Sequence, residues 1–483
     1  MTSTFRARAA YDAFVQLPWK WLFATWTAFV GCQHARPATS SGDLHSADHR
    51  QIISADVVPH IAAGSGAPVA DAQSGCVPVN ADGFVIDGAV RSLQLAAHGT
   101  QAELVAVRNY HQAYQGQAEP RGDDHDVDGY EYRVLDVATA TVPPALRDDA
   151  SLPNPNRGHS DGHCGYDRDV GAPVWTAGGW SRWRVASAWG TAACEPCGGV
   201  RGRVPPTGPS LDERNADAIP SELVTARDDN MVLGAAVILS DAEQRACDTR
   251  GRVDSLIESP TGLTRTTLYQ QREGEMGDPA GVPDAVSVAL GTSRGAVVFR
   301  MGQRAIVYAR VGRNGQREGD LQWLTAREPA TNGAGPAVGA PAAAFIGDEL
   351  VIVWSARIER GGPYQLHYVR WDPSSGVAPA PRVVHASTDD QLAPTLVVST
   401  DRIALTWMEG DVGRRGVVRF ATVPRETAIE HLADAIVTLS PGSIVNARDP
   451  EMAIDGSTIW IAWQEFPAPR TARVRAIAMR CHP

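Results

Sequence analysis

Lysine is almost absent from this chain of 483 residues. Of its 44 basic residues, Lys20 is the only lysine and all the others are arginine. Basic residues as a class are also outnumbered by 55 acidic residues, which gives a net charge of −11. Such a surface repels phosphate backbones, so we expect no nucleic acid among its partners.

Long apolar runs are also missing. A helix that crosses a bilayer takes about 20 apolar residues, and no segment beyond residue 31 reaches that length. This excludes a membrane transporter. The one short apolar run, Trp21–Gly31, is mostly apolar and ends in Val30-Gly31-Cys32. It follows several basic residues, the order that export machinery reads.

This N-terminal stretch resembles a bacterial lipoprotein signal, although Phe29 stands where that family prefers leucine. The resemblance implies that residues 1–31 are a signal peptide and that Cys32 becomes the first mature residue and carries lipid such as palmitate. It implies attachment to a membrane through that lipid and a place in the bacterial cell envelope, with the outer membrane favoured over the inner. Cleavage would also remove the only lysine, so the mature protein has none for a Schiff base or a general base.

The next segment, residues 32–75, is rich in Ala, Ser, Gly, Asp and His and has few large apolar side chains. It cannot bury enough apolar surface to fold alone. We expect a flexible tether there, followed by one folded domain at residues 76–483.

Six cysteines remain if Cys32 is lipidated, and an even number in an oxidising compartment favours disulfides. Cys76 opens the folded region and Cys481 ends it, so this pair is the favoured bond. The other four, which would staple a loop-rich insertion, are Cys164, Cys194, Cys197 and Cys247. Sequence alone does not fix the connectivity. The H-x₃-H and C-x₂-C spacings between residues 159 and 197 also suit zinc, but disulfides are the favoured interpretation.

Three segments in the C-terminal half share one pattern: Pro341–Trp354, Pro394–Trp407 and Pro450–Trp463. In each, apolar residues alternate, turn-forming residues follow, and the alternation resumes. Period-two alternation on both sides of a turn predicts a β-hairpin with one buried face. A weaker fourth copy runs from Gly295 to Tyr308. Another strand-like run follows each hairpin.

The repeat is therefore about fifty residues long and carries three or four strands, which is typical of the blades of a β-propeller. We predict an all-β propeller of about seven blades, with six as the next choice. A first-half hairpin around Leu95 and Leu104 would take 130–137 as its outer strand. Residues 150–220, rich in Gly, Pro, Trp and Cys, are interpreted as an insertion or a decorated blade.

The stretch from Ser399-Thr400-Asp401 to Thr406-Trp407 resembles the Asp box of sialidase-like propellers in degenerate form. The resemblance covers the repeats from Gly295 onward and implies the fold. Sialidase chemistry also needs an arginine triad and a Tyr/Glu pair, and no F-R-I-P-type segment marks them in this chain. The repeated tryptophans are interpreted as packing residues of the blades rather than as sugar platforms.

One acidic run suggests calcium as a cofactor. Asp124, Asp126, Asp128 and Gly129 form D-x-D-x-D-G, the first half of a calcium loop. The twelfth position, where an EF-hand has glutamate, is Leu135. A solvated acidic loop is therefore favoured over a calcium site. The G-x-S-x-G at 158–162 lacks the strand and helix of a hydrolase elbow and is rejected.

The favoured function is a lipid-anchored, non-catalytic scaffold that binds a protein or a glycan through the loops of the propeller. The alternative is a sialidase-like glycoside hydrolase. Acids that follow the repeated aromatic strands are its candidates: Glu359, Glu409 and Glu465. Convergence of these acids beside arginines at the channel mouth would favour the enzyme.

Overall fold

The structure is a computed structural model, and it describes part of the chain. The described residues are 75–79, 83–90, 92–111, 126–139, 141–143, 146–147, 170–176, 179–187, 207–213, 218–228, 231–241, 249–259, 262–271, 282–302, 304–325, 337–359, 361–411, 415–442, 444, 446–468 and 471–481. All of them belong to a single compact unit.

These residues form seven β-sheets, which follow one another in chain order. The first comprises β3 (Ser92–His98), β4 (Gln101–His111), β5 (Asp126–Asp136) and β6 (Leu146–Arg147). The second comprises β7 (Val170–Thr176), β8 (Gly179–Ser187) and β9 (Thr207–Glu213). The third comprises β10 (Ala218–Arg227), β11 (Val232–Asp241), β12 (Thr249–Ser259) and β13 (Gly262–Gln270). The fourth comprises β14 (Pro283–Leu290), β15 (Arg294–Met301), β16 (Ala305–Gly312) and β17 (Gln322–Trp323).

The remaining sheets are built in the same way. The fifth comprises β18 (Ala337–Ile346), β19 (Glu349–Arg357), β20 (Gln365–Trp371) and β21 (Arg382–His385). The sixth comprises β22 (Asp390–Val398), β23 (Arg402–Asp411), β24 (Arg415–Pro424) and β25 (Val437–Thr438). The seventh comprises β26 (Asn446–Asp455), β27 (Thr458–Ala468), β28 (Thr471–Cys481), β1 (Cys76–Pro78) and β2 (Phe84–Asp87). The helices among the described residues are two short 3₁₀ turns, η3 (Pro373–Ser375) and η4 (Ile429–Ala435). No helix in this part of the chain has the length and apolarity to span a bilayer.

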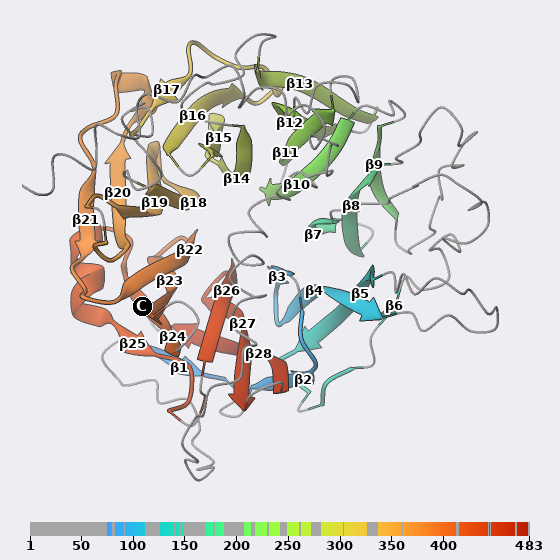
Figure 1. Cartoon of the computed structure of the whole chain (residues 1–483), viewed down its shortest axis with the longest axis vertical. Coiled ribbons are helices and arrows are strands. Elements are labelled where there is room, and N and C mark those ends of the chain that lie inside the picture. The colour runs from blue at the N-terminus through green and yellow to red at the C-terminus, as the bar shows by residue number, and fades with distance from the viewer. Residues whose placement is uncertain are drawn as a thin grey trace, which may run out of the picture. The chain divides into compact units, whose positions relative to one another are not determined.

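The sheets are the blades of a propeller (Figure 1). The first strand of each sheet packs against the first strand of the next, in the order β3, β7, β10, β14, β18, β22 and β26, and β26 returns to β3. Clusters of buried apolar side chains join neighbouring blades from the third to the seventh, and the seventh to the first. The described residues therefore contain seven blades, as the repeat length predicts.

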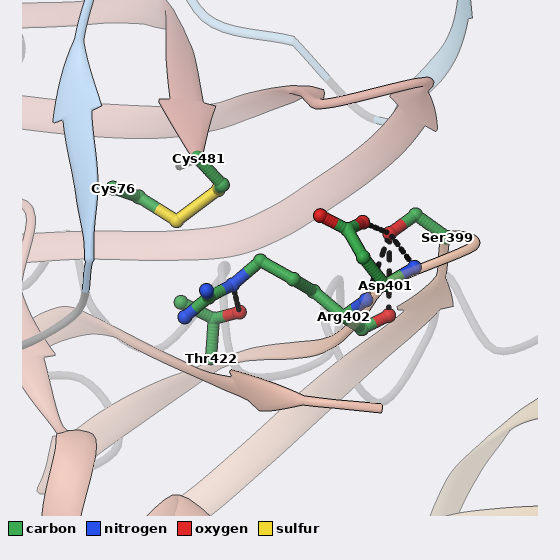
Figure 2. The surroundings of a disulfide bond; sticks show 6 residues. All are labelled: Cys76, Ser399, Asp401, Arg402, Thr422 and Cys481. Atoms are coloured by element: carbon green, nitrogen blue, oxygen red, sulfur yellow. Dashed lines mark hydrogen bonds between the residues drawn. A yellow bond between two sulfur atoms is a disulfide. The ribbon is translucent and has the colours of Figure 1, made fainter. Parts of the chain in front are cut away.

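The seventh blade closes the ring by combining both ends of the folded region. β1 and β2 pair with β28, so the N-terminal strands form the outer edge of a blade whose other strands are C-terminal. Cys76 and Cys481 stand opposite each other in this ladder and form a disulfide across 405 residues of sequence (Figure 2). This is the pair that the sequence analysis favours.

The three Pro-to-Trp segments form the first two strands of the fifth, sixth and seventh blades. Their tryptophans, Trp354, Trp407 and Trp463, are buried in the core, as the alternation predicts. The fourth copy was assigned to the wrong pair of strands. Gly295 to Tyr308 spans β15 and β16, the second and third strands of their blade, and the first hairpin is β14–β15. Any two consecutive strands of a blade alternate around a turn, so alternation alone does not identify the inner strand.

Residues 150–220 include β7, β8 and β9, which form the second blade, and the first strand residues of β10. Of the two interpretations of this segment, a decorated blade therefore fits these strands. β9 pairs with β8 in parallel, unlike the other neighbours, and the segment between them contains Cys194 and Cys197. These two, together with Cys164 and Cys247, lie outside the described residues.

Candidate functional site

The inner strands share an irregularity near their first residues. The register shifts in β7, β10, β14, β18, β22 and β26, and a proline lies at or beside each shift. Proline has no N–H for a ladder hydrogen bond, so it is tolerated at a bulge. Ala393 and Asp449, each directly before a proline, have φ values of 50° and 52°. The backbone there leaves the regular strand and turns individual side chains away from the blade faces.

Of the two closely matching bulges in β22 and β26, only the one in β26 is acidic. Ala393-Pro394-Thr395 in β22 occupies the position of Asp449-Pro450-Glu451 in β26, whereas in β18 the shift ends at Pro341, which is paired with Trp354. The uncharged bulge of β22 has the same register shift and a similar positive φ before its proline, so this structure does not need the carboxyl groups. The two acids of β26, which we call the acidic bulge, therefore require an explanation other than blade structure.

Neighbouring groups hold the acidic bulge in place. The hydroxyl of Thr395 in the sixth blade donates to the Pro450 carbonyl at 2.9 Å. Gln464 Nε2 donates to Asp449 Oδ2 at 3.1 Å, and Arg448 Nε lies 3.7 Å from the same oxygen. The Arg448 guanidinium also lies 4.2 Å from the centre of the Phe466 ring. Fixed contacts of this kind preorganise a site.

Glu451 differs from Asp449 in having no hydrogen bond or ion pair among the described residues. Its side chain is half-buried on the inner strand and is closely surrounded by protein atoms. Burial and the negative charge of Asp449 raise its pKa to about 8. Glu451 is therefore mostly protonated at neutral pH and can donate a proton or a hydrogen bond.

A second bulge acid, Asp284 of β14, is already paired. Arg300 Nε and Nη2 each donate to its carboxylate at 2.7 Å. The same guanidinium reaches the carbonyl of Val338 in the fifth blade at 3.5 Å. Arg300 is almost wholly buried, so this bidentate pair ties two blades together rather than presenting a free carboxylate.

The acids that follow the repeated tryptophans have structural roles. Glu465 is fully buried and accepts hydrogen bonds from Trp463 Nε1 at 3.1 Å and from Arg473 and Arg475 at 2.7 Å. Glu409 likewise accepts from Trp407 Nε1 at 3.1 Å and lies 3.4 Å from Arg419. Each carboxylate satisfies a buried indole N–H and an arginine of its own blade.

The third tryptophan lacks this arrangement. Trp354 is followed two residues later by Ala356, and its indole N–H has no partner among the described residues. His367 stacks beside it in the place of the arginine, with ring centres 6.3 Å apart. Glu359, the remaining sequence candidate, is exposed on a loop. The three acids therefore do not form one site.

The chain matches no protein-family model and no curated protein. Solved structures resemble it at low identity. An α-L-arabinanase from Penicillium chrysogenum, complexed with arabinobiose, is 8% identical, with 84% of this chain and 98% of the other covered and a TM-score of 0.41. A GH43 endo-arabinanase from Bacillus licheniformis is 10% identical, with coverage of 69% and 92% and a TM-score of 0.33. An α-L-arabinofuranosidase from Podospora anserina is 11% identical, with coverage of 56% and 93% and a TM-score of 0.32. The fold is established by the sheets of this chain, and these similarities do not indicate its activity.

The calcium hypothesis stays a prediction. Asp124 lies outside the described residues, and the structure describes only the backbone of Asp126 and Asp128, at the start of β5. Among the described side chains, no three His, Cys, Asp or Glu residues gather as metal ligands would. Cys32 and the tether also lie outside the described residues.

Sequence reasoning missed the acidic bulge. A signal was nevertheless present, because aligning the three segments on their prolines shows acids on both sides of Pro450 alone. Chemically, the bulge offers two carboxyl groups in different states. One is protonated near neutral pH, and the other is held by an amide beside a guanidinium. Such a pair can carry out acid–base chemistry or bind hydroxyl groups.

Proposed function

We propose that the acidic bulge is a glycan-processing site and that the protein is a glycoside hydrolase. Glycosidic bonds are cleaved by a carboxylic acid that protonates the leaving oxygen, acting together with a second carboxylate. The proposal assigns proton donation to Glu451 and the second role to Asp449. One observation supports it above the others: Glu451 and Asp449 lie on one bulge, where burial and the charge of Asp449 raise the pKa of Glu451 to about 8.

Assays on a panel of 4-nitrophenyl glycosides and polysaccharides test this proposal with the full chain. We expect turnover that falls as the pH rises above about 8, where Glu451 loses its proton. Glu451→Gln should lower kcat by about 10²-fold or more. Glu426→Gln, at an exposed position, is the matched control and should leave the rate unchanged. An equal rate for Glu451→Gln would refute the assignment, and absence of turnover across the panel would refute the hydrolase.

The second candidate is a non-catalytic scaffold that binds a protein or a glycan. The contacts of Glu409 and Glu465 favour this function, because they hold each carboxylate inside its own blade instead of at a shared channel mouth. A glycan array probed with and without calcium distinguishes the two functions. Binding without turnover, together with loss of binding in Asp449→Asn, would favour the scaffold over the enzyme.

Either function is proposed to operate from the cell envelope, with lipid on Cys32 and residues 32–75 as the tether. Mass spectrometry of the mature N-terminus tests this. A lipid-modified Cys32 is the expected result, and an unmodified N-terminus elsewhere would remove the anchor from the proposal.

A further inference from the structure

A cavity separate from the acidic bulge lies where inner strands end rather than where they begin. Its volume is about 340 Å³, and three consecutive blades contribute to it: β18 through a strand residue, and β22 and β26 through their last residues and the turns that follow them. Phe345, Val398 and Ile454 line it from the same register position, opposite Leu350, Ile403 and Ile459 respectively. All three are half-buried. The cavity therefore has an apolar wall that the repeat itself generates, of a size suited to a small molecule.

Arg425 supplies a positive charge to the same cavity. Its backbone N–H donates to the Asp401 carbonyl at 2.7 Å, and its Nη1 donates to the Thr400 carbonyl at 3.4 Å. No carboxylate pairs with this guanidinium among the described residues. Most of its N–H donors therefore have no protein acceptor there, in a group whose fork geometry suits a carboxylate.

The turn at residues 399–402, which accepts both of these hydrogen bonds from Arg425, is braced by its own side chains. Ser399 Oγ donates to Asp401 Oδ1 at 2.6 Å and accepts from the Arg402 N–H at 3.0 Å (Figure 2). The side chain of Arg402 in turn donates to Thr422 at 3.1 Å. A turn braced in this way holds the cavity wall in one position.

An acid completes the cavity on the side of the seventh blade. Asp455 Oδ2 accepts from the Gly99 N–H and lies 3.5 Å from His98 Nδ1. The His98 ring stacks on Trp175 at 4.3 Å. These contacts engage one oxygen of Asp455, and the carboxylate is partly exposed, so its other oxygen can accept from a ligand hydroxyl.

We propose that this cavity binds an acidic sugar, with the sugar carboxylate on Arg425, a hydroxyl on Asp455 and the C–H face of the ring against Phe345, Val398 and Ile454. Each part of the cavity requires a different group on one ligand. Arg425 requires an anion, Asp455 a hydrogen-bond donor, and the apolar wall an apolar face. A uronic acid carries all three. This site is distinct from the acidic bulge and does not depend on the function proposed for it.

Isothermal titration of the full chain with methyl β-D-glucuronide tests the proposal. Methyl β-D-glucoside and acetate serve as probes that lack the carboxylate and the sugar ring. We expect the glucuronide to bind at least about tenfold more tightly than either probe, since both the ionic contact and the ring face contribute. Arg425→Gln should weaken binding of the glucuronide by about tenfold or more.

Arg480→Gln is the matched control, because Arg480 is exposed, has no ion pair among the described residues and changes the net charge equally. It should leave binding unchanged, and the thermal melt of each variant reports whether it is folded. The proposal would be overturned if acetate bound as tightly as the glucuronide, if Arg425→Gln bound the glucuronide as tightly as the wild type does, or if the glucuronide did not bind at all. If Arg425→Gln fails to fold, Val398→Asp, which places a like charge beside the sugar carboxylate, replaces it with the same expectation.

Discussion

Glu451 is the residue whose charge state the fold alters most plainly. In an unfolded chain its carboxyl group would ionise near pH 4.5, whereas in the folded protein its pKa is about 8. The folded state thus binds the proton more tightly. Its contribution to stability is complete below about pH 4.5 and is lost as the pH rises towards 8. Asp449 adds to this effect through its negative charge, and Arg448 is the nearest basic group on the same strand.

We therefore expect Glu451→Gln to match the wild type in stability at pH 5 and to exceed it at pH 9. The difference at high pH should be at most about 5 kcal/mol, since the pKa rises from 4.5 to about 8 and each unit of pKa shift corresponds to about 1.4 kcal/mol. Urea denaturation at the two pH values measures it. Glu426→Gln should show no such divergence, and a constant difference for Glu451→Gln across pH would contradict the shifted pKa.

At the scale of elements, the second strand of a blade carries a repeated unit in which a tryptophan donates to a glutamate two residues later. The two side chains share a face because strand residues alternate. An arginine on the third strand stands opposite the tryptophan, as Arg419 does for Trp407 and Arg475 for Trp463. The unit thus links two strands through a buried charge network.

Breaking this unit should be costly. Glu465→Gln leaves Arg473 and Arg475 without their carboxylate, and removal of one partner of a buried ion pair costs about 3–5 kcal/mol. Glu349→Gln removes a surface pair with Arg370 and should cost less than about 1 kcal/mol. Chemical denaturation compares the two. A small effect at Glu465 would mean that the arginines are satisfied in another way.

Elements were predicted from the sequence where the repeat was strong. The hairpins of the last three blades follow directly from alternation around Gly347, Asp401 and Gly456. The segment from Gly295 to Tyr308 was aligned with the wrong strands because β15, the second strand of its blade, has no tryptophan. The acidic bulge was missed because a register shift depends on the partner strand. The apolar-walled cavity was missed because its lining comes from the ends of three inner strands, which lie side by side only in the closed ring.

At the scale of the whole molecule, closure of the ring depends on two short strands, β1 and β2, and one covalent bond. β1 has three residues, and Cys76 and Cys481 are both buried. The pairing could be inferred from the sequence because a propeller joins its two ends in one blade. The number of blades could be inferred from the repeat length. The partners of the other cysteines could not be inferred, because no repeat constrains their pairing.

Replacement of both cysteines by serine should lower the stability of the propeller by roughly 3–5 kcal/mol, because the bond closes a very long loop. Thermal melts of the double variant, compared with oxidised wild type, measure this loss. Reduced wild type should behave like the variant. If the melts coincide, strand pairing alone closes the ring.

The same bond makes the folded chain a covalent circle. A protease that cuts one loop between two blades would open this circle without dividing it, and both sides of the cut would remain joined through Cys76 and Cys481. Two cuts would be needed to release a fragment. For a protein proposed to be anchored in the cell envelope, a single cut would therefore leave every blade attached to the others.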